Sequence, residues 1–159
     1  MTTRFVRLAA TALMLAATPA SSGTYELGAL VLDTPWVRAT PPGAAVAGGY
    51  VTITNTGERA ARLVDGEAAF AGRVEIHEMT MADGVMRMRP LADGLIVPPG
   101  ETVPLEPGGY HVMFMELVEP LVSGETVRAT LTFAEAGAIE LPFTVAPMGA
   151  SGRSEEHTS

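Results

Sequence analysis

Histidine and methionine are the residues of this chain whose type and spacing indicate chemistry. The 159-residue sequence contains nine methionines, three histidines and no cysteine. Most of the methionines gather in one stretch that also holds two of the histidines. The clustered side chains are His77, Met79, Met81, Met86, Met88, His111, Met113 and Met115. Because imidazole and thioether groups are the neutral donors that soft metal ions prefer, the cluster predicts a metal site.

Strand alternation predicts that several of these donors share a face. In the segment 110–115, Val112 and Phe114 share one face of a strand, and His111, Met113 and Met115 share the other. If the two apolar residues fill the core, the donors point outward, onto an exposed face.

The segment 74–79 has the same pattern. Val74 and Ile76 point inward there, and His77 and Met79 lie on the opposite face. Methionine is also a flexible core filler, so an isolated Met-x-Met pair such as Met86 and Met88 is better explained by packing. Two His-Met groups beside one Met-x-Met group favour metal binding.

The elements that must position these donors are short strands. Runs rich in Val, Thr, Ile, Leu and Phe alternate with Gly, Pro, Asn and Asp, and no long helical pattern occurs. The predicted fold is all-β, a single-domain Greek-key sandwich or barrel. Asp83-Gly84 predicts a hairpin between 73–77 and 85–88. The predicted core includes Val74, Ile76, Val112, Phe114, Val127 and Leu131.

The two ends of the chain predict export and a non-folding tail. Arg4 and Arg7 precede an apolar run at 8–17 and small residues at 18–22, the pattern of a cleaved signal peptide over residues 1–22. A membrane anchor is the alternative, but the run is shorter than the ~18 residues that a spanning helix needs. With no cysteine to carry a lipid, the mature domain, 23–150, is expected to be free in the periplasm. Residues 151–159 look like translated adapter sequence, although a natural tail in which His157 assists metal capture is the alternative.

Charge and motif content exclude several functions. The formal net charge of −8 argues against nucleic acid and anionic lipid as partners. No catalytic triad or phosphate-binding loop stands out, so the protein is not expected to be an enzyme. Glu75 and Glu78 flank His77 and are interpreted as solvated strand residues. An electron-transfer blue copper site needs a cysteine, which the sequence lacks.

The spacing of the donors resembles that of a known family. His77 and Met88 are separated by ten residues, and twenty-two more precede His111-x-Met113. Together with Met88-Arg89-Pro90 and the segment 107–113, this pattern is similar to the periplasmic copper chaperones of the PCuAC type over essentially the whole mature domain. Relative to some members, one extra residue falls near positions 93–96, where a loop is expected.

The resemblance implies a cupredoxin-like fold and one Cu(I) per chain held by His77, Met88, His111 and Met113. Met79, Met86 and Met115 are possible auxiliary ligands. The implied function is delivery of copper by a monomer to an acceptor, either the binuclear copper domain of cytochrome c oxidase or an accessory thiol copper protein. A periplasmic copper scavenger or buffer is the alternative function, and a structural adhesion module is a third.

Overall fold

The computed structural model describes residues 23–151 of the chain. The predicted signal peptide, residues 1–22, lies outside the described residues, and so does most of the predicted tail at 151–159. No helix among residues 23–151 is long and apolar enough to cross a membrane.

Strands make up nearly all of the regular structure in this range, as the sequence predicts. In chain order they are β1 (Thr24–Leu27), β2 (Leu30–Arg38), β3 (Val46–Asn55), β4 (Ala61–Ala68), β5 (Ala71–Ala82), β6 (Val85–Pro90), β7 (Leu95–Val97), β8 (Thr102–Pro104), β9 (Tyr110–Leu117), β10 (Thr126–Ala134) and β11 (Gly137–Ala146).

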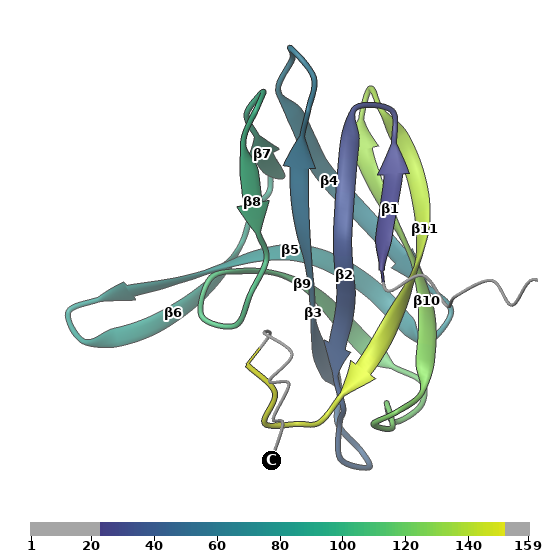
Figure 1. The fold of residues 1–159 in the computed structure, drawn as a ribbon. Coiled ribbons are helices and arrows are strands. Elements are labelled where there is room, and N and C mark those ends of the chain that lie inside the picture. The colour runs from purple at the N-terminus through teal and green to yellow at the C-terminus, as the bar shows by residue number, and fades with distance from the viewer. Residues whose placement is uncertain (1–22, 152–159) are drawn as a thin grey trace, which may run out of the picture.

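Seven of the strands close into a barrel. Their hydrogen-bonded order is β2-β11-β10-β4-β5-β9-β3, and an additional β2–β3 pairing closes the circle. The β11–β2 pairing is parallel, and the neighbouring pairs are antiparallel. Strands β1, β6, β7 and β8 extend the sheet beyond this circle (Figure 1). The predicted all-β barrel is confirmed.

The core lies inside the barrel and follows the predicted alternation. Val112, Phe114 and Leu131 are fully buried, and Val74 and Ile76 are buried beside them. The sixth predicted core residue, Val127, is only partly buried and packs against the cluster from its edge.

The β5–β6 hairpin forms at the predicted turn. Asp83 and Gly84 both have positive φ, 52° and 75°, as a two-residue turn of the hairpin type requires. Every residue of β6 is exposed, and the hairpin projects away from the barrel (Figure 1).

The expected loop at 93–96 is shorter than predicted. Gly94 turns the chain at φ 81°, but Leu95 already begins β7, which pairs with β4. Part of the segment in which a loop was expected therefore belongs to a short strand.

A bulge in β2 was not predicted. Asp33 pairs with Thr52 and Trp36 with Tyr50, so β2 contains one more residue than β3 between these pairs. Thr34 absorbs the extra residue with a φ of 52°. The bulge reverses the alternation of β2, and Trp36 thereby lies on the outer face together with Tyr50.

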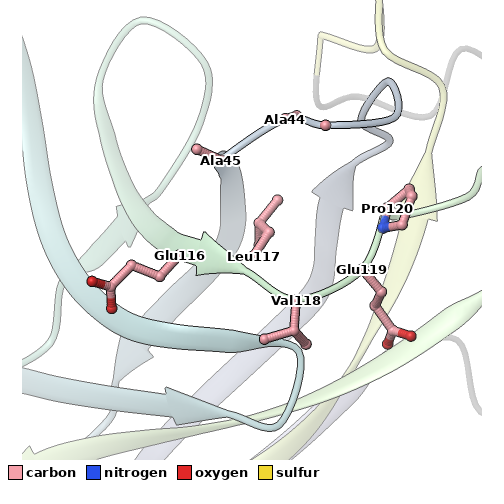
Figure 2. Close-up of a pocket in the computed structure, with 8 residues that line it drawn as sticks. Ala44, Ala45, Glu116, Leu117, Val118, Glu119 and Pro120 are labelled. Atoms are coloured by element: carbon pink, nitrogen blue, oxygen red, sulfur yellow. The ribbon is translucent and has the colours of Figure 1, made fainter.

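A surface depression lies at the end of β9, lined by the β2–β3 connection at 43–45 and by residues 116–120 (Figure 2). Its polar side chains are Glu116 and Glu119, and it contains neither histidine nor methionine. It is therefore a different place from the predicted metal site.

Candidate metal centre

The pairing of β5 with β9 brings the two histidines together. His77 lies opposite His111, and Glu75 lies opposite Met113. Residues two apart on a strand share a face, so these four side chains form one group on the outer side of the barrel. The ring centroids of the two histidines are 5.6 Å apart.

The group lies outside the apolar core but is not exposed, which corrects the expectation of an exposed face. His77 is 8% exposed, His111 4% and Met113 8%. Strand alternation correctly predicted which way these residues point. It could not predict what covers them.

A row of aromatic rings continues from the histidines across the neighbouring strands. The ring centroid of Tyr50 lies 6.4 Å from that of His111, and Trp36 lies 4.4 Å beyond Tyr50. Tyr50 and Trp36 are themselves buried, and burial raises the pKa of the Tyr50 phenol. The aromatic row thus shields one side of the histidine pair from water.

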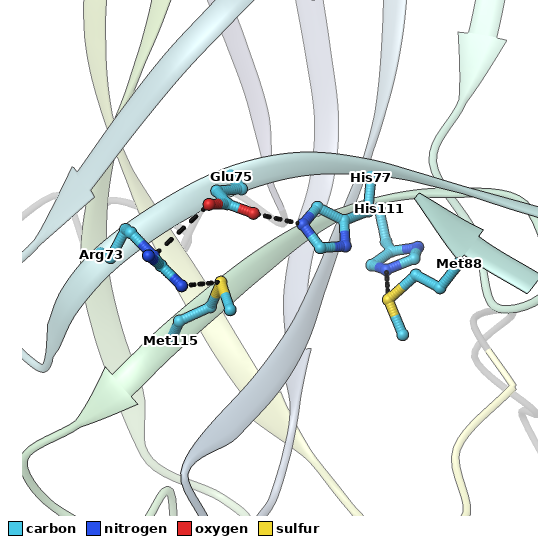
Figure 3. Close-up of polar contacts among 6 residues, drawn as sticks. All are labelled: Arg73, Glu75, His77, Met88, His111 and Met115. Carbon is cyan, nitrogen blue, oxygen red and sulfur yellow. Dashed lines mark hydrogen bonds and ion pairs between the residues drawn. The ribbon is translucent and has the colours of Figure 1, made fainter. Parts of the chain in front are cut away.

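His77 is oriented by a carboxylate. Its Nε2 lies 2.7 Å from Oε2 of Glu75, and this hydrogen bond lowers the pKa of the Glu75 carboxyl, with Arg73 adding to the effect (Figure 3). Because a carboxylate only accepts, Nε2 carries the proton of the neutral ring and Nδ1 carries the lone pair. Nδ1 is buried and has no hydrogen-bond partner. A buried nitrogen lone pair without a partner is a ready metal donor.

His111 has its free lone pair on Nε2, whereas His77 has it on Nδ1. Its Nδ1 lies 3.2 Å from the carbonyl oxygen of Gly109, which can only accept, so Nδ1 donates. Burial lowers the pKa of the His111 imidazole; the Gly109 hydrogen bond opposes this shift, and the nearby His77 adds to it. The neutral ring therefore directs its Nε2 lone pair at the sulfur of Met88, 3.2 Å away (Figure 3). Two electron-rich atoms face each other, an arrangement that a shared cation would stabilise.

The remaining predicted ligands lie at different distances from this pair. Met113 is buried and lies two residues after His111, on the same face of β9. Met79 lies directly opposite Met88 on the hairpin. Met86 lies farther out, opposite Met81.

Met115 is the auxiliary candidate that the structure separates from the histidines. Four residues along β9 from His111 amount to about 13 Å of strand. Its sulfur is 3.6 Å from Nη2 of Arg73, a fixed positive charge (Figure 3). Both observations disfavour a role for Met115 in holding a cation with the histidines.

Glu75 is the residue of the candidate site that sequence reasoning missed. The sequence interpretation treated Glu75 and Glu78 alike, as solvated residues. Glu75 shares the face of His77 and bonds to it, whereas Glu78 lies on the opposite face and accepts hydrogen bonds from Arg89 at 2.8 and 3.0 Å. The i, i+2 spacing of Glu75 and His77 was the available signal.

The donor set suits a soft metal ion. Among residues 23–151, no three His, Cys, Asp or Glu side chains are grouped as they are in sites for hard or borderline cations. Two imidazole nitrogens with free lone pairs, one thioether in contact and a second on the same face favour a soft ion instead.

A family model described as "Putative lipoprotein LpqE-like" matches residues 30–145. The chain belongs to the LpqE-like family. The match spans β2 to β11 and therefore contains the barrel and every residue of the candidate centre. A curated relative with the description "Putative lipoprotein Lxx21020", from Leifsonia xyli subsp. xyli, is 30% identical over 141 residues, which cover 87% of this chain and 82% of the relative.

Solved structures connect this LpqE-like chain to PCuAC domains. The copper-bound PCuAC domain from PmoF2 is 26% identical, with a TM-score of 0.68 over 78% of this chain and 97% of that domain. The solution structure of CuI-DR1885 from Deinococcus radiodurans is 28% identical, with a TM-score of 0.59 over 87% of this chain and 89% of that protein. The resemblance to the PCuAC type and the predicted cupredoxin-like fold are confirmed.

Proposed function

We propose that this protein binds one Cu(I) ion per chain and delivers it to another copper protein. The observation that carries the proposal is the pair of buried imidazoles whose free lone pairs have no hydrogen-bond donor: Nδ1 of His77 and Nε2 of His111. Hydrogen bonds to Glu75 and Gly109 hold both rings in these tautomers.

The ligands are His77, Met88, His111 and Met113. All four are neutral when they coordinate, so the occupied site keeps a single positive charge. Imidazole and thioether donors favour Cu(I), whereas Zn(II) prefers thiolates, carboxylates and more imidazoles than this group offers. Two solved relatives carry copper in their descriptions, the PmoF2 domain and CuI-DR1885.

Met88 makes the site suitable for exchange. It is 46% exposed, whereas the other three ligands are buried, and it belongs to the hairpin outside the barrel. An incoming ligand from an acceptor can replace this outermost thioether while the two imidazoles still hold the ion. Stepwise replacement of this kind supports delivery over permanent storage.

The acceptor in this proposal is a protein with copper-binding thiolates, either the binuclear copper domain of cytochrome c oxidase or an accessory thiol copper protein. Neutral donors hold Cu(I) less firmly than anionic thiolates, so copper moves downhill to such a partner. We place the encounter in the periplasm, with this protein as a non-enzymatic monomer. The lipoprotein description of the LpqE-like family supports export, and the net charge of −8 suits a partner with a basic face.

Competition with a Cu(I) chelator tests the binding. The wild-type chain is expected to take one tightly bound Cu(I) and to bind Zn(II) much more weakly. Met113→Leu retains a buried side chain of similar volume, so it should change stability by less than about 1.5 kcal/mol while weakening Cu(I) binding. No tight Cu(I) equivalent in the wild type would leave the structural-module alternative.

Transfer to a reduced acceptor tests the delivery. Copper-loaded protein is mixed with an equimolar acceptor domain, and the metal content of each is measured at equilibrium. Copper found on the acceptor supports the chaperone. Copper that remains on this protein would favour the scavenger or buffer function.

A further inference from the structure

The β5–β6 hairpin has a face made of methionines. Met79 lies opposite Met88, and Met81 lies opposite Met86. Directly opposed residues share a face, and so do residues two apart on a strand, so all four thioethers lie on one side of the hairpin. This is the side that continues from His77 toward the tip.

Packing does not explain the outer pair. Met81 is 69% exposed and Met86 52% exposed, and both lie beyond the barrel core. Exposed methionines gain little from the hydrophobic effect, and two of them side by side form an apolar patch on a projecting hairpin.

In the projecting part of the hairpin, residues 78–90, the charged strand residues lie on the opposite face. Glu78 pairs with Arg89 across the strands, and Arg87 pairs with Thr80, one residue out of step with the methionines. The guanidinium of Arg89 is held by Glu78 at 2.8 Å on that face. A cation next to Met81 and Met86 thus meets neutral sulfur, and the arginines of the projecting part, Arg87 and Arg89, lie on the other face.

The turn fixes the outer pair in register. The two-residue turn at Asp83 and Gly84, both with positive φ, leaves little freedom for the strands to slip. Side chains directly opposite each other have Cβ atoms about 5 Å apart. Two flexible thioethers at that separation can converge on one ion.

We propose that Met81 and Met86 form a second, weaker Cu(I) site at the tip of the hairpin, from which copper passes to the histidine centre. The proposal rests on the function above. Two thioethers hold Cu(I) less firmly than two imidazoles and two thioethers together, so the ion moves inward to His77 and His111. Met79 lies between the two sites, directly opposite Met88, which is itself a proposed ligand of the histidine centre. Each step makes a copper–sulfur or copper–nitrogen bond as another breaks, and the copper stays Cu(I).

The test compares the wild type with the double variant Met81→Leu/Met86→Leu, which keeps the apolar surface and removes both sulfurs. Cu(I) is titrated anaerobically, once against a strong chelator and once with acetonitrile as a weak competitor. The wild type should retain one Cu(I) equivalent against the strong chelator and two equivalents with acetonitrile as competitor. The double variant should retain one equivalent under both conditions. In methyl NMR spectra, the Met81 and Met86 signals should shift during the second equivalent.

Loading kinetics provide a second readout. Uptake of Cu(I) from its acetonitrile complex into the histidine centre should be severalfold slower in the double variant than in the wild type. The final occupancy of that tight site should be unchanged. Met148→Leu is the matched control, because Met148 is 60% exposed and lies outside the hairpin. A wild type without a second equivalent, or a double variant that retains it or loads as fast as wild type, would overturn the tip site. Loss of the tight equivalent in the wild type would instead overturn the proposed function.

Discussion

Glu75 links the electrostatics of the site to its geometry. Its carboxylate accepts a hydrogen bond from Nε2–H of His77, which leaves the lone pair of Nδ1 free for a metal ion. A carboxylate behind a ligating imidazole also increases the basicity of that ligand. The carboxylate therefore acts on the proposed site through His77.

Replacing Glu75 should weaken copper binding without disturbing the fold. Glu75→Gln keeps the size of the side chain and an acceptor oxygen but removes the charge, so Cu(I) affinity should fall by about tenfold. The matched control is Glu78→Gln, which changes a carboxylate on the opposite face that bonds to Arg89. Chelator competition measures both. Equal affinities for the two variants would mean that Glu75 does not act through His77.

The pH dependence of copper binding should report the histidines. Both rings must be neutral to coordinate, so Cu(I) affinity should fall as the pH decreases below neutrality. Burial lowers the pKa of His111, so protons compete for its Nε2 only below the ordinary value of about 6.5. Chelator competition between about pH 5 and 8 measures the dependence. His111→Met substitutes a donor that does not titrate and should flatten the curve, whereas an affinity that is constant in the wild type would exclude histidine ligands.

The same shift has a consequence for the stability of the copper-free protein. Between the lowered pKa of His111 and about 6.5, the unfolded chain binds more protons than the folded chain. This contribution to the free energy of unfolding is therefore present above pH ~6.5 and is lost as the pH falls toward the folded-state pKa.

At the scale of strands, β3 packs closely on both of its faces through adjacent glycines. A Cβ at Gly49 would lie 2.5 Å from the ring of Phe114 inside the core, and a Cβ at Gly48 would lie 2.8 Å from the hydroxyl of Tyr50 outside it. A side chain added at Gly49 would therefore disturb the core, whereas one added at Gly48 would disturb the aromatic row beside the candidate site.

Alanine at these two positions should have unequal effects. Gly49→Ala pushes against the fully buried Phe114 and should lower the free energy of unfolding by about 1–3 kcal/mol. Gly48→Ala meets only the end of the Tyr50 side chain, so its cost should be smaller, and the displaced ring should alter the surroundings of His111. Denaturant unfolding measures the first effect and histidine NMR shifts the second. The opposite order of stabilities would contradict the assignment of faces.

The sequence predicted those parts of the fold and site that depend on local signals. Asp83-Gly84 specifies a turn and thereby a register, and alternation around Val112 specifies which residues of β9 face inward. The aromatic row beside the donors includes Trp36, which faces outward because Thr34 adopts a positive φ that threonine rarely takes. No local sequence pattern indicates such a bulge, so sequence analysis predicted an exposed metal site.

At the scale of the whole molecule, the barrel and the site are separable. The core cluster is complete without any metal ligand. Closure of β2 onto β3 also removes two sheet edges that would otherwise remain open to pairing. The scaffold is thus expected to persist whether or not copper is bound.

Removal of copper should therefore lower stability but preserve structure. The far-ultraviolet circular dichroism spectrum should be the same with and without Cu(I). At a free Cu(I) concentration of 1,000 times Kd, binding should add about 4 kcal/mol to the free energy of unfolding. Thermal unfolding with and without a chelator measures the difference. A copper-free chain without a cooperative transition would show that the metal is needed for folding.

The aromatic row beside the histidines also gives the molecule an optical reporter. Trp36 is the only tryptophan in the sequence, and its ring stacks at 4.4 Å on Tyr50, whose ring lies 6.4 Å from His111. Its fluorescence therefore originates from a single buried position, separated by the Tyr50 ring from His111, a proposed copper ligand. Changes at His111 reach this fluorophore through Tyr50, so the emission of the unlabelled protein can report copper occupancy while the metal enters or leaves.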